Sequence, residues 1–330
     1  MRFAERLAVV AVAVGSLAAQ GPAIFVHGQR YAMGTMFDVA VYHPVTAPAE
    51  RAIEAALAEI VRLDHVLSHY DADSDLSRLV RSSRGRPVGV DPALYEALNQ
   101  SLEISRLSRG SFDVTIGPLD RLWEAAHASG REPSAEAIAN AKKCVGYEKV
   151  QLVSPNRVQL DSDCLSIDLG GIGKGYAVER AMRILEGAGI AHAVINAGQS
   201  SIAAIGHPPD RGGWLVTAGS NGPGAGDTEL RDSSLSTSRQ ARVPLAGGEH
   251  GYGGIIDPAR GRPVESSTTV VVRAASATQA DALSTTLLLL SIDDGKRLLQ
   301  RFPRASALWI SADGKVLARQ PDVGAAPVKP

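Results

Sequence analysis

The glycine-rich run Asp168-Leu169-Gly170-Gly171-Ile172-Gly173-Lys174-Gly175 constrains the fold of this chain more than any other stretch. It follows an apolar segment and precedes a helically spaced one, so it predicts a turn that opens a helix. Glycines let a backbone approach a ligand closely, and a helix N-terminus beside a lysine favours negative charge. The run thus suits phosphate binding, although a P-loop has other spacing and Ser or Thr in place of Gly175. A plain turn with a solvated Lys174 is the alternative.

The composition is that of a globular protein. The 330 residues are 45% hydrophobic and 21% charged, which is enough for one large core or two fused cores. The chain has no internal repeat and no clear linker, which favours one compact unit. Its formal net charge of -1 argues against nucleic acid as the main partner.

The N-terminus predicts a secretory signal over residues 1–20. Arg2 and Arg6 precede an apolar run, and Ser16-Leu17-Ala18 has the small-x-small pattern of a cleavage site. The run is shorter than the roughly 18 residues of a membrane span. We therefore expect an exported protein, periplasmic or otherwise extracytoplasmic, without a stable membrane span. Residues 320–330 are expected to form a disordered tail.

Cys144 and Cys164 flank a predicted hairpin. Its strands are expected at residues 150–153 and 158–160, on either side of the turn-forming Ser154-Pro155-Asn156. In such a pair the two cysteines come within a few residues of facing each other. A disulfide in an oxidising compartment and two buried free thiols are equal alternatives.

The remaining patterns predict an α+β fold, a single compact domain of mixed β-sheets with flanking helices. Alternation of apolar and polar residues, β-branched content or a central Asp-Gly turn predicts several strands. These strands are expected at residues 37–42, 193–196, 268–272, 307–310 and 315–318. Helices are expected over residues 48–67, from Asp91-Pro92 to Gly110, from the glycine-rich run to Gly187 or Gly189, and from Thr278 through Leu290. The strand, glycine-rich turn, helix and strand around residues 168–196 resemble part of an α/β unit. Residues 219–227 are expected to form a mobile loop.

Asp281 and Thr285 form a candidate metal site. Thr278 is the expected N-cap of their helix, and the four-residue spacing puts both side chains on one face. Two oxygen ligands opposite the carbonyls of a glycine-rich turn suit a hard cation such as Mg²⁺, which prefers about six oxygens. The alternative is that Asp281 caps its own helix and Thr285 lies on the surface.

Two aromatic positions allow either a ligand contact or simple packing. Phe112 and Asp113 follow a helix exit, where they line a pocket or serve as a core residue and a turn cap. Tyr70 lies in a polar segment and is, by itself, more typical of packing than of ligand contact.

Six motifs occur in order along the chain. They are Met33-Gly34-Thr35, residues 68–79, Ser111-Phe112-Asp113-Val114-Thr115 with Pro118-Leu119, residues 168–175, Ile255-Ile256-Asp257-Pro258 and Asp281-Ala282-Leu283-Ser284-Thr285. Each motif alone is weakly specific. As an ordered set they resemble the FAD:protein FMN transferase family, the ApbE-type flavin transferases, over nearly the whole mature chain, residues 21–319.

The resemblance implies a reaction, a cofactor and a set of ligands. Members of that family move FMN from FAD onto a threonine or serine of a target protein, with magnesium and loss of AMP. The implied cation ligands are Asp281, the Thr285 hydroxyl and the carbonyls of Gly171 and Ser284. The implied FAD contacts are Met33, Tyr70, Ser111, Phe112, Asp113, Asp168, Lys174 and the Ile255 backbone.

The chain departs from the family pattern at the flavin end. Where family members commonly carry a histidine that helps to deprotonate the acceptor, this chain has Gly254, with His250 four residues upstream. The usual Ser-Gly is Ser238-Arg239, and the usual Gly-Gly-Asp is Gly198-Gln199-Ser200. These changes leave two alternatives open, an FAD pyrophosphatase that forms FMN and AMP and a non-catalytic flavin-binding protein.

Overall fold

The computed structural model describes residues 22–83, 85–218, 226–240, 243–244, 251–252 and 254–321. The predicted signal, residues 219–225 of the expected loop, His250 and residues 322–330 of the expected tail lie outside the described residues. In the described ranges, we find no helix with both the length and the apolar character that crossing a membrane requires.

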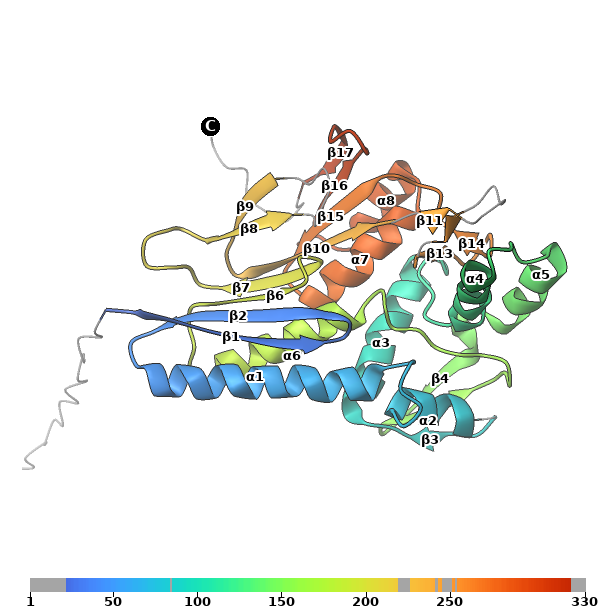
Figure 1. The fold of residues 1–330 in the computed structure, drawn as a ribbon, viewed down its shortest axis with the longest axis horizontal. Helices are drawn as coiled ribbons and strands as arrows, with labels where there is room; N and C mark the ends of the chain where they lie inside the picture. Colours follow the sequence, from blue (N-terminus) through green and yellow to red (C-terminus); the bar gives the residue numbers. More distant parts are fainter. Residues whose placement is uncertain are drawn as a thin grey trace, which may run out of the picture.

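An eight-stranded sheet forms the centre of the molecule (Figure 1). In spatial order its strands are β1 (Ile24–Ala32), β2 (Thr35–His43), β6 (Ala193–Ala197), β7 (Ser201–Ile205), β10 (Ser233–Arg239), β15 (Thr269–Ala274), β16 (Ser306–Ile310) and β17 (Val316–Gln320). Every neighbouring pair is antiparallel. The comparison with an α/β unit around residues 168–196 is therefore wrong, because β6 pairs antiparallel with both neighbours and the strand before the glycine-rich run, β5 (Arg157–Leu160), belongs to another sheet.

Helices cover one face of this sheet. They are α1 (Thr46–Leu67), α6 (Gly173–Gly187), α7 (Ala277–Leu289) and α8 (Ile292–Leu299). Figure 1 shows α1 and α6 side by side along β1, β2 and β6, and α7 along β10 and β15. The hairpin β8 (Trp214–Ala218) and β9 (Gly226–Leu230) packs on β10 from the other face, which encloses a second, smaller core.

The period-two pattern of the central strands separates these two faces. In β7, Ala203 belongs to the main core under the helices, whereas Ile202 and Ala204 belong to the core under β8 and β9. In β10, Leu235 joins the second core, and Ser236 points to α7. The sheet therefore presents buried hydroxyls to the helix that carries Asp281.

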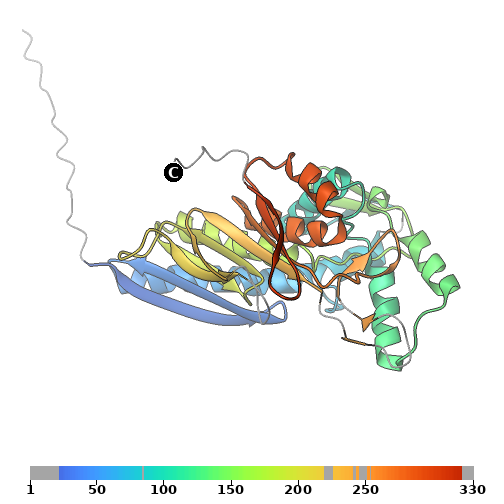
Figure 2. The same cartoon turned by 90° about the horizontal axis from the view of Figure 1, so that it is seen from above.

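The rest of the chain forms a helical region at one end of the long axis (Figures 1 and 2). Its elements are α2 (Asp75–Ser82), α3 (Pro92–Leu107), α4 (Gly117–Ser129), α5 (Ala135–Cys144) and the short helix Tyr147–Lys149, with the three-stranded sheet β3 (Val88–Gly89), β5 (Arg157–Leu160) and β4 (Val150–Val153). Two small hairpins complete it, β11 (Val243–Pro244) with β12 (Gly251–Tyr252) and β13 (Ile256–Asp257) with β14 (Arg262–Pro263). Cys144 and Cys164 form a disulfide across the base of the β4–β5 hairpin, so the disulfide alternative holds.

Most predicted elements are present, and the differences have local causes. The cap of α7 is Ser276, which accepts a hydrogen bond from the Gln279 N–H, so Thr278 is not the cap. Residues 226–227 of the expected loop belong to β9, and Gln320 of the expected tail pairs with Ala307 in β17. Strand β1 was not predicted, because its apolar residues, which include Ile24, Phe25 and Val26 in succession, do not alternate with polar ones.

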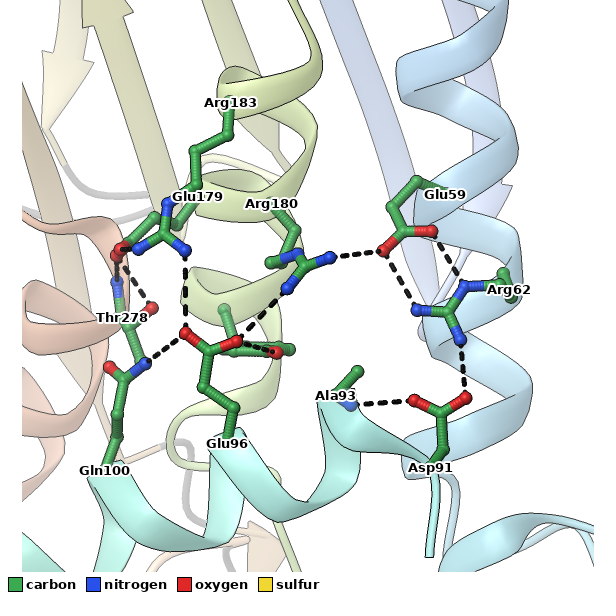
Figure 3. A network of polar contacts seen from close by, with 11 residues as sticks. Glu59, Arg62, Asp91, Ala93, Glu96, Gln100, Glu179, Arg180, Arg183 and Thr278 are labelled. Atoms are coloured by element: carbon green, nitrogen blue, oxygen red, sulfur yellow. Dashed lines mark hydrogen bonds and ion pairs between the residues drawn. The ribbon is translucent and has the colours of Figure 1, made fainter. Parts of the chain in front are cut away.

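A network of charged side chains connects the helices (Figure 3). Glu96 of α3 accepts from Arg180 of α6 at 3.1 Å. Arg180 Nη2 lies 3.6 Å from Glu59 of α1. Glu179 of α6 accepts hydrogen bonds from the Thr278 N–H and hydroxyl at the start of α7, at 3.1 and 2.8 Å. The Arg180 contacts connect α6 with α3 and α1. The Glu179 contacts fix α6 and α7, the two helices nearest the glycine-rich run, relative to each other.

Candidate functional site

A cavity of about 430 Å³ lies where α4, α6, α7, β10 and the loop after α1 meet. Most predicted ligand residues line it: Tyr70, Ser111, Phe112, Asp113, Asp168, Gly171, Lys174, Ile255, Asp281 and Thr285. Met33 lines a neighbouring cavity of about 370 Å³, which shares His69, Tyr70, Gly170 and Lys174 with the first. Ser284 is completely buried and does not line either cavity, so the role of its carbonyl as a cation ligand stays a prediction.

Asp281 is the buried acid of the cavity. Its Oδ2 accepts a hydrogen bond from the Gly175 N–H at 2.8 Å, and its Oδ1 accepts from the hydroxyls of Ser201 and Ser236 at 3.1 and 3.0 Å. Burial raises the pKa of Asp281, and the nearby Lys174 charge opposes that rise. The alternative that Asp281 caps its own helix is wrong, because the N–H it binds belongs to the first turn of α6.

Two glycines of the run permit this close arrangement. A Cβ on Gly175 would lie 2.3 Å from the Ala277 carbonyl oxygen and 2.5 Å from the Asp281 Cβ, so only glycine lets α6 meet α7 here. A Cβ on Gly171 would lie 3.0 Å from Phe112 and 3.3 Å from the Thr285 Cγ2. The glycine-rich run therefore brings its backbone against the face of α7 that carries Asp281 and Thr285.

Serines of β10 form hydrogen bonds with the hydroxyl groups of α7 near that face. The Ser238 hydroxyl lies 2.7 Å from the Ser284 hydroxyl and 3.2 Å from the Thr285 hydroxyl. Ser236 also reaches Ser284, at 3.2 Å. Thr285 is thus a cavity residue held by a neighbouring strand, and its reading as a surface threonine is wrong.

The loop after α1 forms the opposite rim with Asp168. Asp168 Oδ1 accepts from the Gly170 N–H at 2.7 Å and lies 3.4 Å from His69 Nδ1. The rings of His69 and Tyr70 are 3.8 Å apart, centroid to centroid. Tyr70 is 77% exposed, so a packing role inside the core is wrong and its ring is available at the cavity mouth.

Phe112 and Asp113 combine both roles that the sequence allows. Phe112 is buried in the main core and also lines the cavity. The Asp113 carboxylate caps its turn, since Oδ1 accepts from the Thr115 N–H and hydroxyl and Oδ2 accepts from the Tyr147 N–H. Burial raises the pKa of Asp113, and these hydrogen bonds oppose the rise.

The Ile255 backbone is held in place by other protein groups. Its N–H donates to the Gln240 side chain at 3.2 Å, and its carbonyl accepts from the Val264 N–H at 2.9 Å. Gly254 beside it also lines the cavity, and a Cβ placed there would meet nothing within 4 Å. The cavity is therefore open at the position where the resemblance leads us to expect a histidine.

Sequence reasoning did not single out several cavity residues, among them His69, Asp120 and Thr237. His69 Nε2 and Thr237 Oγ1 are, among the described residues, the buried side-chain polar atoms without a hydrogen-bond partner. Such atoms are uncommon in folded proteins and mark positions that a ligand can satisfy. The only sequence signal for His69 was its place beside Tyr70, and no local pattern singled out Asp120 or Thr237.

The residues around Asp281 fit a hard divalent cation. A carboxylate has about four acceptor positions, and Asp281 uses three of them for protein donors, which leaves one on Oδ2. The described residues contain no cluster of three or more His, Cys, Asp or Glu side chains that could hold a metal ion. A cation here would take its other ligands from the Thr285 hydroxyl, backbone carbonyls, phosphate or water, which is the typical environment of Mg²⁺.

Known proteins are similar to this chain in sequence and in fold. The model of the ApbE family matches residues 33–309. Relatives named FAD:protein FMN transferase from Treponema pallidum (strain Nichols) and Klebsiella pneumoniae (strain 342) are 30% and 28% identical, over 87% and 81% of this chain and 84% and 79% of theirs. The solved flavin transferase ApbE from Vibrio cholerae has the same fold, with a TM-score of 0.76 at 23% identity over 91% of this chain and 97% of that one. Because the family model spans most of its length, the chain belongs to the ApbE family.

Proposed function

We propose that this chain is a magnesium-dependent FAD:protein FMN transferase, which attaches FMN from FAD to a Thr or Ser of an acceptor protein and releases AMP. Curated relatives across most of the chain carry that name. The observation that carries the proposal is the convergence in one cavity of Lys174, the Asp281–Thr285 pair and the aromatic Tyr70.

This arrangement suits phosphoryl transfer. A cation at Asp281, together with Lys174, would neutralise charge that develops on the pyrophosphate. The protein would then mainly hold FAD and the acceptor hydroxyl in line. The unpartnered His69 Nε2 and Thr237 Oγ1 supply further hydrogen-bonding positions along the wall.

The test uses the purified full chain with FAD, Mg²⁺ and a threonine-bearing acceptor protein. We expect covalent flavin fluorescence on the acceptor, AMP in equal amount, and loss of both with a chelator. Asp281→Asn should slow transfer at least about 100-fold, whereas Asp293→Asn on the exposed surface of α8 should leave it unchanged. FAD binding without any labelled acceptor or AMP release would contradict the proposal and support a non-catalytic flavin-binding protein.

FAD pyrophosphatase activity is a second candidate, favoured by Gly254. The open space beside this residue leaves room in the cavity for a water molecule where the acceptor hydroxyl would otherwise lie. Release of FMN and AMP at the same rate with and without acceptor would support hydrolysis. Acceptor-dependent AMP release would support transfer.

We also propose that the protein acts outside the cytoplasm. The arginines and apolar run of residues 1–20 support export, and the Cys144–Cys164 disulfide suits an oxidising compartment. A fusion of residues 1–30 to a reporter that is active only after export should be active, and an inactive fusion would count against this proposal.

A further inference from the structure

Asp120 is a cavity acid to which neither the fold nor the proposed function gives a role. It lies in the first turn of α4 and is only 6% exposed. It lines the same cavity as Asp168, Gly254 and Ile255. Its helix packs through Leu119 and Trp123 on Ile256, two residues after the Gly254 position where the resemblance leads us to expect a histidine.

The Asp120 carboxylate differs from the other cavity acids in its hydrogen bonds. Asp113 and Asp281 each use both oxygens for protein donors. Asp168 accepts from the backbone of the glycine-rich run. Among the described residues, none donates a hydrogen bond to Asp120. Because Asp120 lines the cavity, its acceptor positions are available to a bound ligand.

Neighbouring charges give this carboxylate an affinity for protons near neutral pH. Burial, Asp168 and Glu124 raise the pKa of Asp120 to about 7, while Arg121 opposes the rise. Arg121 does not pair with it, because its guanidinium donates to the Ser166 hydroxyl at 2.7 Å. A proton acceptor with a pKa near the working pH is the efficient kind in general base catalysis.

No other group around α4 neutralises Asp120. The titratable or charged groups on the neighbouring elements include His69 and Tyr70 after α1, Lys174 of α6, Glu136, Lys142 and Lys143 of α5, Asp257 of β13 and Arg262 of β14. Lys142 donates to the Ala259 carbonyl, and His69 faces Asp168. Within the described part of the chain, no cation forms an ion pair with Asp120.

We propose that Asp120 is the residue that takes the proton from the acceptor hydroxyl during FMN transfer. This inference rests on the proposed function. The hydroxyl proton moves to the Asp120 carboxylate, and the hydroxyl oxygen forms a bond to the phosphorus of the FMN half of FAD. The pyrophosphate P–O bond breaks, and AMP leaves with its electron pair. The proton on Asp120 then passes to solvent at the cavity mouth.

The test compares single-turnover flavinylation by the wild type, Asp120→Asn and Asp120→Glu from pH 5.5 to 8.5. The wild-type rate should rise with pH with a midpoint near 7, the value to which burial, Asp168 and Glu124 raise the Asp120 pKa. Asp120→Asn should be at least about 100-fold slower and lose that dependence, with FAD affinity unchanged. Asp120→Glu should recover part of the rate and the rising profile.

Glu124→Gln tests the neighbouring charge, since Glu124 lies on the same helix and raises the Asp120 pKa. It should move the midpoint to lower pH, because one charge that raises the Asp120 pKa is gone. A wild-type rate and profile in Asp120→Asn, or an unshifted midpoint in Glu124→Gln, would overturn the assignment. Absence of labelling by the wild type with FAD bound would instead overturn the proposed function, and the assignment with it.

Discussion

The Asp281 carboxylate accepts hydrogen bonds from three residues that are far from it in the sequence. It binds the first turn of α6 through the Gly175 N–H and two strands of the sheet through Ser201 and Ser236. The residue proposed to hold the cation is therefore already oriented by hydrogen bonds within the protein. Such support keeps a binding group in position before its ligand arrives.

Gly175→Ala should separate α6 from α7. The added Cβ would lie 2.3 Å from the Ala277 carbonyl oxygen, so the helices must move apart. We expect a loss of about 1–3 kcal/mol in the free energy of unfolding and weaker FAD binding, measured by urea denaturation and flavin fluorescence. Gly187→Ala, at the other end of α6 with open space around its Cβ, is the control and should be neutral or slightly stabilising. Equal effects at both glycines would contradict this account.

Asp120→Asn should stabilise the protein at alkaline pH. Its pKa is raised from 3.8 to about 7 in the folded state, so the folded state holds this proton more tightly. The wild type therefore loses stability as pH rises between these two values, by at most about 4 kcal/mol. Thermal unfolding should show a higher Tm for the variant at pH 8 and little advantage at pH 4. A Tm difference that does not change with pH would contradict the raised pKa.

Among the helices and strands, α6 and α7 are joined by hydrogen bonds at the point where α7 begins. Glu179 of α6 reaches the start of α7, where it accepts from Ser276 and from both the N–H and the hydroxyl of Thr278 (Figure 3). Burial by itself raises the pKa of Glu179, but these hydrogen bonds and Arg183 lower it overall. One carboxylate thus fixes where α7 begins relative to the helix that carries Lys174.

Glu179→Gln should weaken the contact between α6 and the start of α7. The loss of charged hydrogen bonds should cost about 2 kcal/mol in the free energy of unfolding. Because the folded-state pKa is lowered, the contribution is present above the ordinary value of 4.5 and is lost as pH falls below it. Urea denaturation at pH 7 and pH 4 measures both effects, with the exposed Glu186→Gln on the same helix as control. A variant as stable as Glu186→Gln at pH 7 would rule out this role.

Elements with a local signal could be predicted from the sequence, and those set by distant contacts could not. Asp91 caps α3, and Gly314 has the positive φ of 84° that the β16–β17 turn requires. By contrast, Thr278 has the chemistry of a cap, but Glu179 of another helix engages its hydroxyl, and Ser276 is the cap. Strand β1 lies at the sheet edge, and its apolar residues do not alternate with polar ones, so it gives no period-two signal.

The residues of the candidate site also divide into those that could be predicted from the sequence and those that could not. The ordered motifs predicted the residues that line the cavity, although none was convincing alone. Asp120 could not be predicted, because its character depends on burial and on the charges of Asp168 and Glu124. Asp168 comes from a segment far along the chain, which only the tertiary structure places beside α4.

The Cys144–Cys164 disulfide covalently links two segments of the helical region. It joins the end of α5 to the segment that leads into Asp168, with a sequence separation of 20. The cavity wall contributed by the glycine-rich run is therefore tied to the region that contains α4 and Asp120.

Replacing both cysteines by serine should lower the free energy of unfolding by about 3 kcal/mol, as expected from the unfolded-state entropy of a loop of this length. Urea denaturation of the wild type with and without a thiol reductant measures the same change. The reductant should reach the bond, since Cys164 is exposed. The double variant should not respond to reductant, and a wild type that is equally stable in both conditions would contradict the prediction.

The order of strands in the central sheet follows their order in the chain, from β1 at one edge to β17 at the other. The sheet can thus be assembled strand by strand as the polypeptide becomes available, yet Asp281 and Thr285 arrive only with α7, close to the end. A chain that stops before Ala277 contains six of the eight strands, from β1 to β15, but lacks both Asp281 and Thr285. If the proposed function holds, the residues that would bind the cation are consequently among the last parts of the site that a growing chain acquires.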